Sequence, residues 1–261
     1  MAKRFPAIFV SHGAPLLAIQ PGPAREFLSG LGKTLGKPEA ILTVSAHWES
    51  GDAVVGAPAR PETIHDFYGF PDELYRIKYP APGAPELAVR VRSLLGENGI
   101  DARVQPTRGL DHGAWVPLML MYPDADVPVT QLAVQTALGP VHHLKLGEAL
   151  RRLRDEGVLI LGSGGATHNL REFGRHPEGA APPQWVTGFQ EWLAQTIESG
   201  KSHELLRYRS LAPDAARNHP TEEHFLPLFV PAGAGSPGVA GQRIHRSHTF
   251  GILAMDAYRF D

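Results

Sequence analysis

The sequence of 261 residues predicts an α/β fold, with one domain over residues 1–261 and a central, mostly parallel mixed sheet that has helices on both faces. Three observations support this prediction. Short apolar runs are typical of buried parallel strands. Helical patterns separate these runs, as expected for a sheet covered on both sides. Glycine and proline, with 28 and 24 residues, gather in loops within one domain rather than in a linker.

The predicted elements alternate along the chain. Strands are predicted at Ala7–Val10, Ile41–Ser45, Val127–Val134 and Val158–Gly162. Helices are predicted at Ala24–Leu35, Pro85–Glu97, Val141–Glu156 and Gln184–Glu198. The segment Thr249–Tyr258 fits a last strand of either direction. The long irregular region from about Ser50 to Pro82 predicts a lid or a binding loop.

The composition excludes several classes of function. The chain has no cysteine, which excludes disulfides, thiolate metal sites and a cysteine nucleophile. Its 25 basic and 27 acidic side chains give no basic excess for nucleic acid. The first apolar run is too short for a signal peptide, and no stretch approaches a membrane span. We therefore expect a cytoplasmic protein with small-molecule partners, and the oligomeric state stays open.

Three histidines stand where apolar runs stop: His12, His47 and His168. Because ligands of open α/β sheets bind outside the carboxyl ends of the strands, these imidazoles should meet at one edge of the sheet. Such a group indicates a metal site, proton transfer or both. Glu49 lies two residues after His47 and would orient an imidazole as an outer-shell acceptor.

The glycine-rich segment before His168 has two readings. A phosphate loop is the weaker one, because the Walker lysine is absent and the last glycine of the dinucleotide motif is missing. A histidine just past a glycine-rich strand exit better suits an acid/base role.

Further candidates lie outside the strand ends. Thr221 is a plausible N-cap, with Glu222 and Glu223 near the helix dipole and His224 in the first turn. A well-capped helix would explain the two glutamates without any function. His112 lies between an aspartate and a glycine, close to a tryptophan.

The segment around His65 is rich in aromatic residues. Tyr68 and Phe70 would suit a lid over a flat organic ligand, and loop packing by Phe67, Tyr68 and Phe70 is the simpler alternative. His219 is predicted to be a loop residue. The remaining histidines are expected at the surface: His142, His143, His176, His203, His245 and His248.

A nitrogen-rich site from separate segments, with no sulfur and no H-E-x-x-H helix, suits Fe(II), Zn(II) or Mn(II), with iron and zinc leading.

Six motifs then occur in order: Ser-His-Gly-Ala-Pro, Ser-Ala-His-Trp-Glu, Thr-Ile-His-Asp-Phe-Tyr-Gly-Phe-Pro, Gly-Leu-Asp-His-Gly-Ala-Trp, Gly-Ser-Gly-Gly-Ala-Thr-His-Asn-Leu and His-Pro-Thr-Glu-Glu-His-Phe-Leu-Pro-Leu. Together they resemble the DOPA 4,5-dioxygenase-type branch of the class III extradiol ring-cleavage dioxygenases. The resemblance runs from about Phe9 to the C-terminus.

The resemblance implies a non-haem metal held by His12, His47 and His224. It implies that His168 is the acid/base, which in zinc-filled members approaches the metal as a further ligand. His112 matches a second active-site histidine that contacts substrate.

Many class III enzymes use two histidines and one glutamate, whereas this branch has histidine at the third position. We therefore expect His224 rather than the adjacent Glu223 to coordinate.

The implied reaction opens a catechol, DOPA-like or a related ortho-diphenol, with O2 outside its two hydroxyls. One divalent metal per chain is expected, Fe(II) for ring cleavage and Zn(II) in a crystal, because nitrogen ligands bind zinc tightly and zinc is redox-inert. Two alternatives stay open: a zinc hydrolase with Glu49 or Glu223 as base, and a non-catalytic binding module on the same fold.

Overall fold

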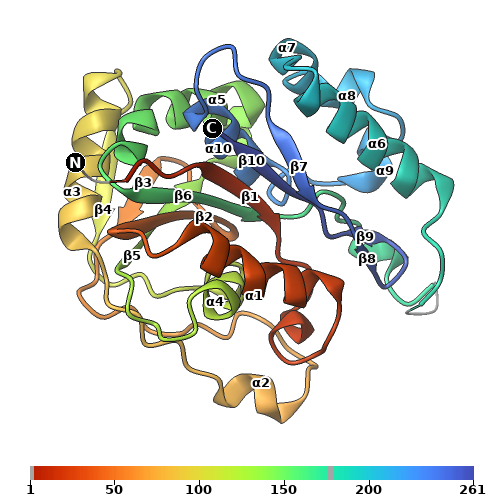
Figure 1. Ribbon diagram of the computed structural model, residues 1–261, viewed down its shortest axis with the longest axis horizontal. Helices are drawn as coiled ribbons and strands as arrows, with labels where there is room; N and C mark the ends of the chain where they lie inside the picture. The colour runs from red at the N-terminus through yellow and green to blue at the C-terminus, as the bar shows by residue number, and fades with distance from the viewer. Residues whose placement is uncertain (1–2, 176–178) are drawn as a thin grey trace.

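The computed structural model describes residues 3–175 and 179–261. A large sheet runs through the middle of the molecule, with helices above and below it (Figure 1). Its eight strands follow the order β4-β3-β5-β2-β6-β1-β10-β7. Their bounds are β1 Ala7–Ser11, β2 Ala40–Glu49, β3 Ala53–Gly56, β4 Ala102–Gln105, β5 Val129–Val134, β6 Val158–Gly164, β7 Gln242–His245 and β10 Ala257–Phe260. A separate pair is formed by β8 His248–Thr249 and β9 Leu253–Ala254.

The centre of the sheet is parallel and its edges are mixed, which confirms the predicted fold class. Strands β5, β2, β6 and β1 pair in parallel. On one side β3 meets β5 antiparallel, and on the other β10 and β7 are antiparallel. Ser11 pairs with Gly164, and Ser45 pairs with Ser163. The neighbouring strands β1, β2 and β6 therefore end close together, and the residues that follow them share one edge.

Helices cover both faces of the sheet. The α-helices of the described residues are α1 Pro23–Leu35, α2 Asp72–Arg76, α3 Pro85–Glu97, α4 His112–Met121, α5 Gly139–Leu150, α6 Gln184–Glu198, α7 Ser202–Leu205, α8 Tyr208–Leu211, α9 Ala215–Asn218 and α10 Phe229–Ala234. Short 3-10 turns are η1 Pro15–Ala18, η2 Thr136–Leu138, η3 Arg151–Arg154, η4 Leu170–Glu172 and η5 Leu226–Leu228. Helices α1 and α4 lie on one face, and α3, α5 and α10 on the other (Figure 1).

The pleat of β1 explains why both faces are apolar. Ile8 and Val10 belong to the core cluster under α1 and α4. Phe9 belongs to the opposite cluster with the helices α3, α5 and α10. Alternate side chains of a strand point to opposite faces, so a strand buried on both sides is apolar throughout.

Several local predictions were wrong. The region from Ser50 to Pro82 is not wholly irregular, because it contains β3 and α2. The predicted strand Thr249–Tyr258 is divided among β8, β9 and β10. No helix begins at Thr221. Its hydroxyl bonds to the Glu223 carboxylate at 3.0 Å instead of capping a helix, and the first helical turn begins only at Leu226.

No helix of the described residues has the length and apolar character needed to cross a bilayer.

Candidate active site and metal centre

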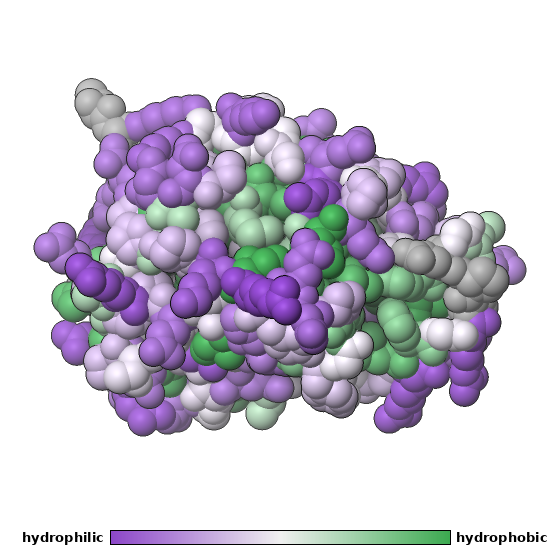
Figure 2. Space-filling view, turned by 90° about the horizontal axis from the view of Figure 1, so that it is seen from below, coloured by the Kyte–Doolittle hydropathy of each residue, from purple (hydrophilic) through white to green (hydrophobic). Residues whose placement is uncertain are grey.

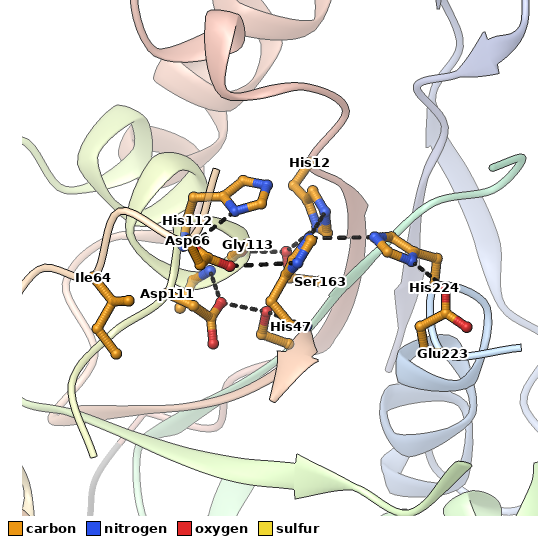
Figure 3. Close-up of polar contacts among 12 residues, drawn as sticks. His12, His47, Ile64, Asp66, Asp111, His112, Gly113, Ser163, Glu223 and His224 are labelled. Carbon is orange, nitrogen blue, oxygen red and sulfur yellow. Dashed lines mark hydrogen bonds and ion pairs between the residues drawn. The ribbon is translucent and has the colours of Figure 1, made fainter. Parts of the chain in front are cut away.

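Three imidazoles converge at the shared edge of the sheet. His12 follows β1, His47 lies near the end of β2, and His224 lies in the turn before η5. The Nε2 atom of His47 lies 3.0 Å from Nε2 of His12 and 3.2 Å from Nε2 of His224 (Figure 3). Their ligand atoms form one group that would fit a metal ion. The structure thus brings together segments that are far apart in sequence.

Glycines allow this convergence. A Cβ atom on Gly113 would lie 2.4 Å from Ser45 Oγ and 2.9 Å from His47 Cδ2, so only glycine lets the start of α4 approach β2 this closely. A Cβ on Gly164 would lie 2.1 Å from the His224 carbonyl oxygen. The glycine-rich exit of β6 therefore makes room for the His224 backbone, and Gly165 N donates a hydrogen bond to that carbonyl.

The environment of His12 determines its tautomer. Its Nδ1 lies 3.0 Å from Ser163 Oγ, and that hydroxyl donates its proton to the Gly113 carbonyl. Ser163 Oγ must therefore accept from His12 Nδ1–H. This leaves a lone pair on Nε2, the atom that faces His47.

Carboxylates do the same for the other two histidines. His224 Nδ1 lies 2.9 Å from Glu223 Oε1, and His47 Nδ1 lies 3.4 Å from Asp66 Oδ2 (Figure 3). With Nδ1 protonated toward these carboxylates, through a hydrogen bond in His224 and a longer ion-pair contact in His47, the Nε2 lone pairs face one another. Metal-binding histidines are typically oriented by such outer-shell acceptors.

The pKa values favour neutral imidazoles. Burial, together with the nearby histidines, lowers the pKa values of His12 and His224 well below the ordinary range. Burial, with a smaller contribution from the neighbouring His112, lowers the pKa of His47 to about 4. Three neutral nitrogen donors with converging lone pairs repel one another without a cation and suit a divalent metal. The residues present therefore fit the implied metal.

His168 lies beside this group rather than within it. Its ring stacks on His224, with centroids 3.5 Å apart and an interplanar angle of 6°. Its ligand atom lies close enough to those of Glu223 and His224 to share a metal ion with them, but it does not form such a set with His12 and His47. No hydrogen-bond partner for its ring nitrogens occurs in the described part of the chain. Burial lowers the pKa of His168 to about 4, so at neutral pH its ring is an unprotonated base.

Asp66 is a site residue that the sequence analysis did not identify. Its Oδ1 accepts from His112 N at 2.9 Å and from His112 Nδ1 at 3.0 Å, while Oδ2 faces His47 (Figure 3). Burial raises the pKa of Asp66, but the hydrogen bonds from His112 outweigh burial and hold this pKa at about 2. One ionised carboxylate therefore orients both His47 and His112. Its position next to His65 in the aromatic motif was the available signal.

A second carboxylate, that of the fully buried Asp111, fixes the start of α4. It caps the helix by accepting from Ala114 N, and it accepts from Ser45 Oγ at 2.5 Å and from Arg108 Nη2 at 2.9 Å. Arg108 also donates to the His47 carbonyl at 3.3 Å. The network ties the first turn of α4, which carries His112, to the end of β2.

A cavity of about 420 Å³ opens over the histidines. His47, His112, His168 and His224 lie in its wall together with Asp66. Apolar side chains complete the lining: Pro15, Phe67, Tyr68, Phe70, Leu170, Phe173 and Leu253. Tyr68 and Phe70, which the sequence predicts as part of a lid, thus line this cavity.

Other predicted residues lie elsewhere. The structure does not bring His65 into the cavity lining. Its Nε2 bonds to the Ile77 carbonyl, and its ring packs on Trp115. Glu49 does not orient an imidazole, because its carboxylate accepts from Thr136 Oγ1 at 2.5 Å. The prediction that His143 is a surface residue was wrong, because it is fully buried. His176 lies outside the described residues.

Comparisons with known proteins identify the family of the chain. Residues 6–256 match the family model described as the catalytic LigB subunit of aromatic ring-opening dioxygenase. Over 256 residues the chain is 46% identical to a 4,5-DOPA dioxygenase extradiol of Beta vulgaris, covering 97% of this chain and 95% of that protein. It is 39% identical over 236 residues to the protein of the same name from Escherichia coli K12, covering 89% and 86%.

The fold has a solved counterpart. The crystal structure of an uncharacterized protein from Escherichia coli K12 superimposes with a TM-score of 0.83 at 33% identity, covering 99% of this chain and 100% of that one.

Proposed function

The chain belongs to the LigB family of aromatic ring-opening dioxygenases and is an extradiol dioxygenase, and we propose that His12, His47 and His224 hold its metal while His168 and His112 act on the substrate. The convergence of three Nε2 atoms within 3.0–3.2 Å supports this assignment most strongly. The substrate would be a catechol, DOPA-like or a related ortho-diphenol, and the relatives named as 4,5-DOPA dioxygenases support that choice.

We propose Fe(II) as the working metal, with Zn(II) as an inert substitute. When held by His12, His47 and His224, Fe(II) would supply the redox chemistry with O2 that zinc lacks. Glu223 would orient His224 rather than coordinate the metal, because its Oε1 lies 2.9 Å from His224 Nδ1.

His168 would move the proton. Its unprotonated ring lies in the cavity wall, and none of the described residues bonds to its nitrogens, so it would take a proton from a catechol hydroxyl and return one later in the reaction. A general acid/base of this kind contributes about 10²–10⁴-fold to a rate. The stacked His224 keeps the His168 ring in one orientation.

His112 would contact the substrate through Nε2. Asp66 accepts from its Nδ1, which leaves Nε2 free to bond with a catechol or an oxygen atom in the cavity. Tyr68 and Phe70 would cover the aromatic ring and exclude water. Neither candidate base favours a zinc hydrolase, since Glu49 bonds to Thr136 and Glu223 bonds to His224, both outside the cavity lining. The cytoplasmic location stays a prediction.

The test is to load the apo-protein with Fe(II) without oxygen, add a catechol, admit air, and follow oxygen uptake together with a yellow ring-opened product. Folded, iron-loaded protein that consumes no oxygen across a catechol panel would exclude the proposal. Ester or amide hydrolysis with Zn(II) and no oxygen would instead indicate the hydrolase.

A further inference from the structure

His168 lies between an open side and a packed side of the protein. On the open side, Leu170 and Phe173 line the cavity, although 60% and 44% of their surfaces remain accessible to solvent. Figure 2 shows apolar residues gathered among polar ones at the centre and right of one face of the molecule. Apolar side chains offer no hydrogen bond to an imidazole nitrogen. The position of His168 must therefore be set from the packed side, through the loop that carries it.

Hydrogen bonds to the end of α9 hold this loop beside the His168 ring. His168 N donates to the Asn218 carbonyl at 3.0 Å. The next side chain, Asn169, donates from Nδ2 to the Arg217 carbonyl at 2.6 Å. Neither contact uses the imidazole nitrogens of His168. The end of α9 therefore fixes the chain and leaves these nitrogens available to a ligand.

The residue that follows α9 adds a side-chain contact to the same loop. His219 Nε2 lies 3.0 Å from the carbonyl oxygen of Ala166, two residues before His168. A carbonyl oxygen only accepts, so Nε2 carries the ring proton and donates it. The His219 ring is fully buried and packs against Phe189 and Phe225, with centroids 5.4 and 4.6 Å away. The donor is thus held in one place relative to the loop.

The bond to Ala166 is what distinguishes histidine from an apolar residue at this position. Burial lowers the pKa of His219 to about 3, so the ring is neutral at neutral pH. Its Nδ1 is buried, and none of the described residues bonds to it. Phenylalanine would fill the space without burying a polar nitrogen, which is costly. His143 differs, because both of its nitrogens bond to the backbone.

The segment from α9 to His224 holds the loop at several points. Gly165 N donates to the His224 carbonyl at 2.8 Å, and the His168 ring stacks on the His224 ring. Arg209 fixes the chain between these points, because its Nη1 donates to the His219 carbonyl at 2.6 Å. A displacement of the loop would therefore move the His168 ring relative to His224.

We propose that His219 is a positioning residue that holds the Ala166 carbonyl and thereby fixes the place of the His168 ring in the cavity wall. It is not a catalytic residue, because it does not belong to the cavity lining. This inference rests on the proposed acid/base role of His168.

Two substitutions that differ in one hydrogen-bond donor test the proposal. His219→Gln keeps an N–H donor, and His219→Met has a side chain of similar length without one. We expect kcat of the Fe(II)-loaded enzyme to fall by about 10–100-fold in His219→Met, since a misplacement of about 1 Å can cost about 10²-fold. In His219→Gln, which retains the hydrogen bond, kcat should stay within about threefold of wild type. The catechol Kd and the zinc affinity should stay near wild type in both variants, because His219 does not line the cavity.

His143→Met is the matched control, because His143 is also fully buried but bonds to Gly139 and Gln135. It should lose thermal stability and keep its kcat. An equal loss of kcat in His143→Met and His219→Met would overturn the inference, since general destabilisation would then explain both. Equal kcat values in His219→Met and His219→Gln would also overturn it. If His219→Met does not fold, His219→Phe takes its place as the variant without a donor.

NMR spectra of the Zn(II)-loaded protein give a readout that does not depend on turnover. The stacked His224 ring shifts the ring protons of His168, and His168→Ala identifies their signals. These signals should move in His219→Met and stay near their wild-type positions in His219→Gln. Unmoved signals in His219→Met would overturn the inference. Moved signals in a protein whose wild type opens no catechol ring would support the positioning role and contradict the proposed function.

Discussion

His143 and the histidine cluster at the sheet edge, His12, His47 and His224, differ in what their ring nitrogens face. His143 on α5 has both nitrogens satisfied by the backbone, with Nδ1 2.7 Å from the Gly139 carbonyl and Nε2 accepting from Gln135 N at 3.1 Å. At the sheet edge, His12, His47 and His224 have their Nδ1 atoms satisfied and their Nε2 atoms directed at one another. Burial lowers the pKa in both groups, so a shifted pKa alone does not identify a site.

This difference supports a structural role for His143 and a metal-binding role for His12, His47 and His224. A histidine that uses both nitrogens within the fold has no lone pair left for a ligand. A cluster that leaves three lone pairs at one point is costly without a cation. Mutations that treat the two groups alike should therefore give opposite results.

The largest expected effect is the loss of metal in His47→Ala. Removing an outer-shell partner costs about 10–100-fold in metal affinity, so removing a ligand should cost more than about 100-fold. Chelator competition followed by elemental analysis measures this affinity. His143→Ala should keep its metal affinity and lose thermal stability instead. Comparable metal affinity in wild type and His47→Ala would show that the three nitrogens are not the site.

Replacing His168 should separate its role in catalysis from metal binding. We expect His168→Ala to lower kcat by about 10²–10⁴-fold, the usual contribution of a general acid/base. Its metal content should stay near that of wild type, because His168 does not group with His12 and His47. If metal content falls together with kcat, His168 is a ligand. Rescue of activity by added imidazole would support the proton-transfer role.

A smaller effect is expected from Asp66→Asn. The asparagine amide keeps the shape of the carboxylate, but it has only one oxygen that can accept a hydrogen bond. His112 and His47 therefore lose part of their orientation. We expect metal affinity and kcat to fall by about 10–100-fold, as for other outer-shell carboxylates. Glu49→Gln is the matched control, because its carboxylate bonds to Thr136. A loss of activity in Glu49→Gln equal to that in Asp66→Asn would contradict the assignment of roles to the two carboxylates.

The sequence predicted the parts of the fold that depend on local apolar pattern. The strands β1, β2, β5 and β6 were predicted because they are buried on both faces and are apolar throughout. The four-residue β4 was missed, because Arg103 and Gln105 are polar and the strand pairs only with β3. Its structure depends on a neighbour that local sequence does not specify.

The residues of the candidate site also differ in whether the sequence predicts their positions. His12 follows β1 and His47 lies near the end of β2, so the fold class alone predicts both at one edge of the sheet. Asp66 reaches His112 across 46 residues of chain, and no periodicity indicates such a contact. His224 was predicted as a ligand from the family resemblance, but the capped helix expected around it is a turn, because the Thr221 hydroxyl bonds to Glu223. Its role as a ligand stays a prediction.

The smallest expected effect belongs to the structural histidine and appears in stability rather than activity. Burial lowers the pKa of His143 to about 4 in the folded state, against its ordinary value of 6.5 when unfolded. Below about pH 6.5 the unfolded state binds more protons, so stability falls as the pH decreases toward 4. Between pH 7 and pH 5 this histidine should account for a loss of about 2 kcal/mol.

Urea unfolding of wild type and His143→Gln at both pH values measures this term. The variant is expected to be less stable at pH 7 and to lose about 2 kcal/mol less than wild type on acidification, since its side chain does not titrate. The other buried histidines contribute to both proteins and cancel in the difference. An identical pH dependence in the two proteins would mean that His143 is protonated equally in both states. The backbone contacts of Gly139 and Gln135 would then not distinguish it from the histidines at the sheet edge.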